Sequence, residues 1–293
     1  MSYLVPLVED APAKVNLTLR VLRRRDDGYH EIESLVAFAD FGDRLSFSRG
    51  GDLTLKVHGP NAAAAGEGDD NLVLKAARAL AARRPDIVLG AFGLEKLLPV
   101  AAGLGGGSAD AAAALRLIAQ ANGVARDDPD IHAAARVTGA DVPVCLDPRP
   151  RIMRGIGEVL SASLALPQLP ALLVNPGVAL ATKAVFAEWK PAAALPAPLD
   201  LAAIAKLTSR DELLGLLATQ ANDLEEPAIA LRPAIADVLN VLRGLPGCSL
   251  ARMSGSGASC FALFAAAAAA REAAAILRTK LPNWWVRAGA LGG

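Results

Sequence analysis

The sequence predicts an α+β protein of two domains, and three observations lead to that prediction. The chain has 293 residues, of which 53% are hydrophobic and 20% charged, enough for one large core or two ordinary ones. Prolines cluster from Pro167 to Pro198, so we expect a boundary near residue 160 that separates domains 1–160 and 161–293. The second half reads as β-α-α-β-β-α-β, an order typical of a ferredoxin-like sandwich.

The first half begins with strand patterns. From Ala13 to Val21, apolar and polar residues alternate, which predicts a half-buried strand. Lys14 and Asn16 share its polar face, and that face is either solvated or lines a binding site. Asp27-Gly28 predicts a turn, with Tyr29 and His30 directly after it. The segments IESLVAFADFGDRLSFS and DLTLKVHG then predict two more strands of an antiparallel sheet.

A glycine-rich loop lies at the centre of the chain. An apolar run over residues 87–98 predicts a strand, and Gly103 and Gly105 to Gly107 follow Pro99. We expect an alanine-rich helix to begin at Ser108. Glycines allow backbone N–H groups to approach a ligand, and a helix N-terminus adds a positive dipole, so the loop predicts an anion site. The alternative is an ordinary tight turn. The amino-acid sequence of this loop matches neither the Walker phosphate loop nor the dinucleotide-binding motif.

Helices and strands surround this loop in the expected order. Asp70 is expected to cap a helix over Asn71 to Arg83, and a second short helix covers Asp128 to Val137. Asp141 then precedes an expected apolar strand, VPVCL, where it is either a turn residue or a functional acid. The remaining elements are expected in this order: a strand in ALLVNPG, helices over 200–219 and 227–244, strands on either side of the 254–259 turn, a helix over 265–281, and a strand in WWVRAGAL.

Composition excludes several classes of function. Thirty basic residues balance thirty acidic ones, which argues against a nucleic-acid surface or a basic membrane patch. Three scattered cysteines lack metal-ligand spacing, and we expect them to be reduced core residues. No stretch has the length of a membrane helix and no leader is apparent, so we expect a cytoplasmic protein. Ala192 to Pro198 is a low-complexity segment that we expect to form a surface loop.

Five ordered motifs make the pattern specific. They are APAKVNLTLRV, DGYHEIES, LPVAAGLGGGSADAAAAL, GADVPV and SGSGASCFALF. Together they resemble the GHMP kinases, the small-molecule kinases of galactose, homoserine, mevalonate and phosphomevalonate. Ala101 and Ala102 stand where that family often has glycine. The resemblance implies a two-domain fold, with a ribosomal-protein-S5-domain-2-like N-terminal domain that binds ATP and a ferredoxin-like C-terminal domain.

The resemblance also implies a reaction and its participants. The motifs are similar to those of the family branch that phosphorylates cytidine diphosphate-linked methylerythritol in the non-mevalonate isoprenoid route, with ATP and Mg²⁺. It implies Lys14 and Asp141 at the transferred phosphate, and Ser108 as a ligand of the metal. The implied nucleotide-binding residues are Asn71, Lys96, Pro99, Val100, Ala101, Ala102, Gly103, Leu104, Gly105, Gly106, Gly107, Ser108 and Ala109. The implied substrate-binding residues are Asn16, Tyr29, His30, Thr182 and Phe186.

Two other functions stay open at this point. The acceptor could be homoserine or a mevalonate-like alcohol, in which case Tyr29, His30 and Phe186 would lose their role beside cytosine. The chain could instead bind a nucleotide without catalysis, although a binder needs neither Lys14 nor Asp141. The aromatic rings could also simply fill gaps in the packing. We expect no nucleic-acid or membrane partner, and a monomer or a weak homodimer.

Overall fold

The computed structural model describes residues 6–191 and 197–292, which divide into two compact units interleaved along the chain. The first unit contains residues 1–13, 41–100 and 105–148, and the second contains 14–40, 101–104 and 149–293. The strands β1 (Leu7–Asn16) and β3 (His30–Arg49) therefore contribute to both units. The predicted domains were contiguous in sequence, and their boundary at residue 160 stays a prediction. Most of the expected loop at Ala192 to Pro198 lies outside the described residues.

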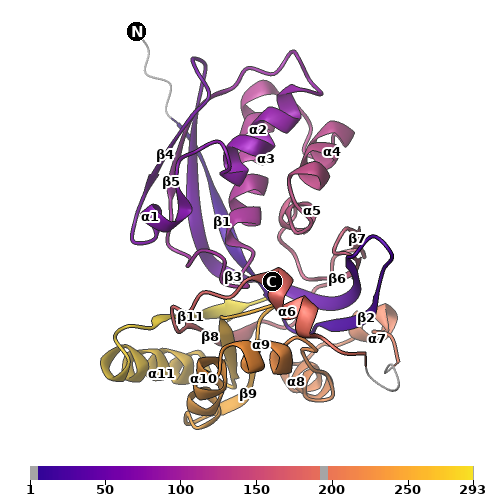
Figure 1. Cartoon of the computed structure of the whole chain (residues 1–293), viewed down its shortest axis with the longest axis vertical. Coiled ribbons are helices and arrows are strands. Elements are labelled where there is room, and N and C mark those ends of the chain that lie inside the picture. The colour runs from indigo at the N-terminus through magenta and orange to yellow at the C-terminus, as the bar shows by residue number, and fades with distance from the viewer. Residues whose placement is uncertain (1–5, 192–196, 293) are drawn as a thin grey trace. The chain divides into compact units, whose positions relative to one another are not determined.

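The first unit is a sheet with helices against it (Figure 1). Besides its parts of β1 and β3, it contains β4 (Thr54–His58), β5 (Gly90–Glu95), α1 (Ala62–Ala65), α2 (Leu72–Ala81), α3 (Gly106–Asn122), α4 (Pro129–Thr138) and α5 (Val142–Cys145). Strand β5 pairs antiparallel with β3 and parallel with β4. The expected all-antiparallel sheet is therefore wrong at β4. The chain between β4 and β5 includes α2, and a helical crossover of this kind suits a parallel pair.

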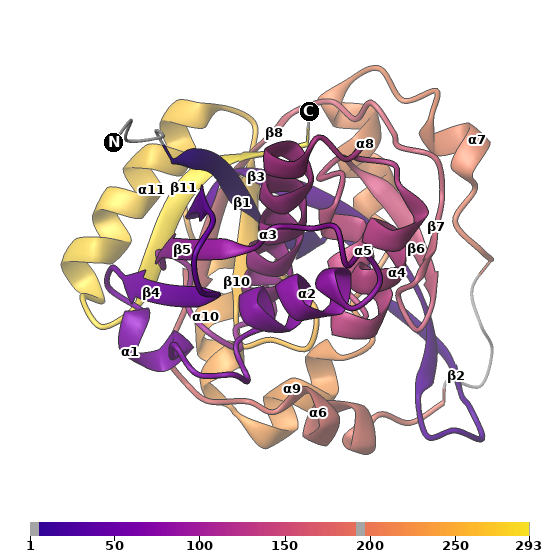
Figure 2. The same ribbon diagram turned by 90° about the horizontal axis from the view of Figure 1, so that it is seen from above.

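Helix α3 is the central helix of this unit. Its residues Ala109 to Ala119 are all buried, and Figure 2 shows α2 beside it. Alanines allow the two helices to approach closely, while Val73, Leu74 and Leu80 of α2 fill the space around them. The cap of α2 differs from the prediction. Asn71, not Asp70, accepts the Val73 N–H at 3.0 Å, because the chain is still in a turn at Asp70.

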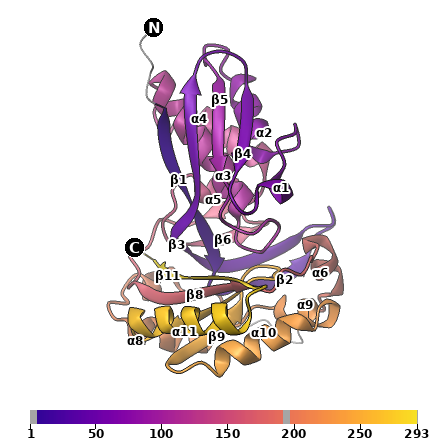
Figure 3. The ribbon, with the colours of Figure 1, turned by 90° about the vertical axis from the view of Figure 1, so that its left-hand side faces the viewer.

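The second unit is an antiparallel sheet with helices on one face (Figure 3). It contains β2 (Arg20–Arg24), β6 (Arg151–Gly155), β7 (Val159–Leu160), β8 (Leu169–Asn175), β9 (Cys248–Met253), β10 (Cys260–Phe264) and β11 (Trp285–Leu291). Its helices are α6 (Thr182–Glu188), α7 (Leu201–Ile204), α8 (Arg210–Ala218), α9 (Glu225–Leu231), α10 (Ala234–Arg243) and α11 (Ala267–Lys280). The strand order β11-β8-β10-β9 confirms the predicted alternation, although each of the two long helices is divided into shorter ones.

Apolar residues hold the helices of the second unit against one face of its sheet. Val174 of β8, Ala262 of β10, Leu239 of α10 and Ala273 of α11 belong to one buried cluster.

The predicted strand over Ala13 to Val21 is corrected to two strands, because β1 ends at Asn16 and β2 begins at Arg20. Its polar face is also buried, so Lys14 and Asn16 do not form a solvated surface.

Candidate active site

The phosphate loop, which we define as Pro99 to Ala109, has an unusual backbone conformation. Ala101, Gly103 and Gly105 have φ values of 52°, 77° and 62°, in the left-handed region. Ala101 adopts this conformation at a cost of about 1–2 kcal/mol, which explains why a glycine would suit its position. Helix α3 begins at Gly106 with Gly105 as its cap, two residues earlier than the predicted start at Ser108. Ser108 therefore lies in the first turn, where backbone N–H groups point out of the helix.

The middle of this loop, residues 101–104, belongs to the second unit and accepts three hydrogen bonds within it. Ser254 Oγ donates to the Gly103 carbonyl at 2.9 Å, and the Ser259 N–H donates to the Ala102 carbonyl at 3.1 Å. The Lys14 N–H donates to the Leu104 carbonyl at 2.9 Å. A Cβ atom at Gly103 would lie 2.4 Å from the Ser254 carbonyl oxygen, so only glycine fits. Three successive peptide groups therefore have fixed orientations.

Lys14 and Asn16 lie at the end of β1 and are 4% and 2% exposed. The Asn16 amide donates to Ser34 Oγ at 2.8 Å, and its backbone N–H donates to Ser254 Oγ at 3.2 Å. Its side-chain oxygen is buried and, among the described residues, accepts no hydrogen bond. A buried acceptor without a donor is uncommon in a folded protein and often indicates a ligand contact.

Asp141 lies immediately before α5 and is partly exposed. The predicted strand after it is wrong, because Val142 to Cys145 form a buried helical turn. Pro143 favours this turn, since proline has a suitable φ and needs no N–H partner at a helix start. The Arg116 guanidinium donates to the Cys145 carbonyl at 2.8 Å and holds the turn against α3. Asp141 belongs to the first unit and Lys14 to the second, and their joint role stays a prediction.

Asn71 and Lys96, the two nucleotide-binding candidates outside the loop, have structural partners. Asn71 caps α2 and its amide donates to the Gly66 carbonyl at 2.9 Å. The Lys96 ammonium lies 2.5 Å from Asp43 and 2.6 Å from Asp110, and all three side chains are buried. Burial opposes the charge of Lys96, but the attraction of Asp110 and Asp43 outweighs it and raises the pKa of Lys96. The nucleotide contacts of Asn71 and Lys96 stay predictions.

Three aromatic rings of the second unit form a cluster, His30, Phe186 and Trp189, which we call the aromatic cluster. His30 stacks on Phe186 with ring centroids 4.8 Å apart and an interplanar angle of 28°. Trp189 meets His30 edge-on at 5.6 Å and 85°. Burial, followed by the nearby Arg24 charge, lowers the pKa of His30, which favours its neutral form.

The two remaining substrate-binding candidates are placed differently. Tyr29 is 59% exposed, and its N–H donates to Asp27 at 3.1 Å within the turn. Thr182 opens α6, four residues before Phe186, and shares a 2.8 Å hydrogen bond with Ser256. Sequence reasoning missed Trp189. Its position three residues after Phe186, directly beyond the end of α6, was the available signal.

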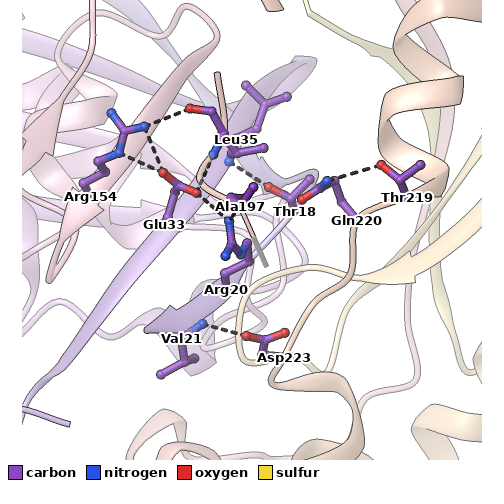
Figure 4. Close-up of polar contacts among 11 residues, drawn as sticks. Thr18, Arg20, Val21, Glu33, Leu35, Arg154, Ala197, Thr219, Gln220 and Asp223 are labelled. Carbon is purple, nitrogen blue, oxygen red and sulfur yellow. Dashed lines mark hydrogen bonds and ion pairs between the residues drawn. The ribbon is translucent and has the colours of Figure 1, made fainter. Parts of the chain in front are cut away.

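A buried network fixes the strands that bring His30 to the aromatic cluster (Figure 4). Glu33 of β3 accepts from Arg20 at 3.0 Å and from Arg154 at 2.9 Å. It also accepts the Leu199 N–H at 2.8 Å. Since β2 and β3 pair as far as Arg24 and His30, this network holds the position of the hairpin.

Within residues 6–191 and 197–292, no three side chains of His, Cys, Asp or Glu gather in a way that could hold a metal ion. Over the same ranges, every helix is too short or too polar to span a bilayer.

Comparisons with known proteins identify a family that is consistent with the glycine-rich loop and with the fold. The GHMP kinases N terminal domain family matches residues 71–147, and the GHMP kinases C terminal family matches residues 201–283. The chain belongs to the GHMP kinase family. Its relatives include the 4-diphosphocytidyl-2-C-methyl-D-erythritol kinases of Methylorubrum extorquens and Methylobacterium radiotolerans, which are 55% and 57% identical. Each alignment covers 96% of this chain and 97% of the relative.

Solved structures support the same assignment. A crystal structure of 4-(cytidine 5'-diphospho)-2C-methyl-D-erythritol kinase is 37% identical, with a TM-score of 0.79 over 98% of this chain and 100% of that one. A homoserine kinase from Cytophaga hutchinsonii has a TM-score of 0.66 over 99% of this chain and 95% of that one. At 20% identity it shows a shared fold alone.

Proposed function

We propose that this chain transfers the γ-phosphate of ATP to the 2-hydroxyl of 4-diphosphocytidyl-2-C-methyl-D-erythritol, a step of the non-mevalonate isoprenoid route. The observation that carries this proposal is the match to kinases of that name at 55–57% identity over 97% of their length. The phosphate loop supports it independently. Its left-handed residues and the start of α3 form a main-chain surface suited to bind phosphates.

The reaction requires alignment and charge stabilisation more than covalent help from the protein. Backbone N–H groups from Gly103 to Ser108 bind the β- and γ-phosphates of ATP. Asp141 accepts the proton of the acceptor hydroxyl as its oxygen attacks the γ-phosphorus. Lys14 supplies a fixed positive charge beside the transferred phosphate.

Mg²⁺ accompanies ATP, and the residues present fit a metal that is bound mainly by the nucleotide. Mg²⁺ usually keeps several waters and needs few protein ligands, so the lack of an acidic cluster among the described residues is compatible with it. Ser108 in the first turn of α3 would supply one hydroxyl ligand. The metal would neutralise charge on the phosphates.

The acceptor is selected by the second unit. Phe186 and Tyr29 would stack against the cytosine, and His30, neutral at pH 7, would hydrogen-bond its polar edge. The side-chain oxygen of Asn16, which lacks a donor among the described residues, would accept a hydrogen bond from a hydroxyl of the sugar alcohol. Thr182 would contact the same ligand. A homoserine or mevalonate kinase would not need these rings.

An assay of ATP consumption tests this proposal. The cytidylated alcohol, homoserine and mevalonate are compared as acceptors, and we expect turnover with the first alone. Asp141→Asn preserves shape but removes the base, so its kcat should fall roughly 100-fold or more while ATP affinity stays the same. Turnover within a few-fold of the parent would show that Asp141 only positions the substrate. Faster turnover of homoserine or mevalonate would overturn the proposed acceptor.

A further inference from the structure

Asp43, Lys96 and Asp110 form a buried ion-pair cluster in the first unit, which we call the buried triad. The Lys96 ammonium is 2.5 Å from Asp43 Oδ2 and 2.6 Å from Asp110 Oδ2. The three residues are 1%, 2% and 3% exposed, so their charges are shielded from solvent. The triad therefore acts on the protein around it.

The members of the triad lie at both ends of the phosphate loop. Lys96 follows β5, three residues before Pro99, and Asp110 follows Ala109 directly. The ion pair of Lys96 with Asp110 thus joins the entry of the loop to its exit. Asp43 of β3 strengthens the entry, because its Oδ1 accepts the N–H groups of Leu97 at 2.6 Å and Leu98 at 2.8 Å.

The triad also lies against the loop itself. A Cβ atom at Gly106, the first residue of α3, would lie 3.2 Å from Lys96 Nζ and 3.5 Å from Asp43 Oδ2. The backbone at the start of α3 is therefore in close proximity to the charged groups. Any movement of the triad would change where the first N–H groups of the helix point.

Stability alone is a weak reason for such a cluster. Removing charges from water costs several kcal/mol for each ion, and buried ion pairs often stabilise a fold no better than apolar residues of the same size. Asp110 is also incompletely satisfied. Its Oδ1 is buried and lacks a hydrogen-bond partner among the described residues. Directional charge-assisted bonds do, however, fix geometry more strictly than apolar packing.

We propose that the buried triad is a positioning device that closes the phosphate loop and holds its N–H groups ready for ATP. Asp43 and Asp110 are positioning residues, since they act through the loop and through Lys96. This inference rests on the proposed function, because it requires the loop to bind the phosphates.

The test uses Asp110→Asn and Asp43→Asn in the full chain. Lys96 is left unchanged, because a direct nucleotide contact is predicted for it. Calorimetry measures the Kd of a non-hydrolysable ATP analogue, steady-state kinetics give kcat and both KM values, and hydrogen exchange follows the amides of residues 99–109. We expect each variant to raise the Kd of the analogue about 10-fold, as for the loss of a charged hydrogen bond. Loop amides should exchange faster, whereas the KM of the acceptor should not change.

Glu9→Gln is the matched control. Glu9 pairs with Arg116 at 3.0 Å, a buried cation on the same helix α3 but six residues beyond Asp110. This variant should lower the melting temperature and leave the Kd of the analogue and the exchange of the loop unchanged. Asp110→Asn keeps the pair of Lys96 and Asp43, so it carries the test if Asp43→Asn fails to fold.

Two results would overturn the inference in distinguishable ways. If the triad variants lower the melting temperature but bind the analogue like the parent, the triad serves stability alone. If the parent chain does not bind the analogue, the proposed function fails and this inference fails with it.

Discussion

The phosphate loop and the aromatic cluster, the two proposed binding regions, differ in the groups that they present to a ligand. The loop presents main-chain groups; Ser254 donates to its Gly103 carbonyl, and Asp43 accepts the Leu97 N–H just before it. The aromatic cluster offers ring faces of His30, Phe186 and Trp189, all partly exposed. A phosphate is common to all ATP-dependent kinases, so a rigid main-chain site can bind it without specific side chains. A cytosine needs side chains of particular shape.

The difference suggests where each region tolerates change. At Gly103 of the loop, an added methyl group would meet backbone atoms of Ser254 and Gly257. In the aromatic cluster, the loss of one ring removes contact area and leaves the other rings in place. Backbone changes in the loop should therefore have larger effects than side-chain or protonation changes in the aromatic cluster.

Gly103→Ala should have the largest effect. Its Cβ would lie 2.4 Å from the Ser254 carbonyl oxygen, and its φ of 77° is strained for alanine. We expect the Kd of ATP to rise about 100-fold or more, as measured by calorimetry. The matched control is Gly123→Ala at the other end of α3, where φ is 68° and a Cβ meets nothing within 4 Å. An ATP affinity of Gly103→Ala equal to that of Gly123→Ala would show that the conformation of the loop at Gly103 is not needed for ATP binding.

Phe186→Ala should weaken the cytidylated substrate. If the ring stacks on cytosine, its loss costs about 1–3 kcal/mol, or roughly 10-fold or more in the substrate KM. ATP affinity and the melting temperature should stay close to the parent. A fall in melting temperature without a change in KM would instead identify Phe186 as a packing residue.

Trp189→Ala should have a smaller effect in the same direction. The ring meets His30 edge-on, and pairs of this kind contribute about 0.5–1.5 kcal/mol. We therefore expect the substrate KM to rise about 3-fold through a less ordered His30. Steady-state kinetics in the Phe186→Ala background provide the check, because coupled residues give a less than additive loss.

The smallest expected effect is on the pH dependence of stability. The folded pKa of His30 lies below its unfolded value of about 6.5, so the unfolded chain binds the proton more readily. Stability should therefore be lost as pH falls from about 6.5 through the folded pKa. Thermal unfolding of the parent and of His30→Gln between pH 5 and 7.5 should show a steeper loss in the parent. His132→Gln on α4 is the control.

The sequence predicted the loop better than the aromatic cluster, for physical reasons. Glycine spacing before an alanine-rich helix is a local signal, and the structure confirms the helix with its start moved from Ser108 to Gly106. The triad escaped prediction because Lys96 and Asp43 are 53 residues apart, and only folding brings them together. Trp189 escaped prediction for a similar reason, since its partner His30 lies on β3, far from it in the sequence.

The predicted secondary structure was wrong where the pattern of apolar residues could not show how a segment is buried. The segment Val142 to Cys145 is apolar and reads as a strand, yet it forms a buried helical turn beside α3. Short apolar runs are ambiguous between the two states, because both bury every residue. Lys14 and Asn16 show the same limit. Alternation placed them on a polar face but could not tell that this face is buried.

A paired binding measurement tests the central claim, that the loop binds ATP and the aromatic cluster binds the acceptor. Calorimetry would measure the Kd of a non-hydrolysable ATP analogue and the Kd of the cytidylated alcohol for the parent, Gly103→Ala and Phe186→Ala. The account predicts a crossed pattern, in which Gly103→Ala loses the analogue and keeps the alcohol, and Phe186→Ala does the reverse. Parallel losses of both ligands in either variant would contradict it.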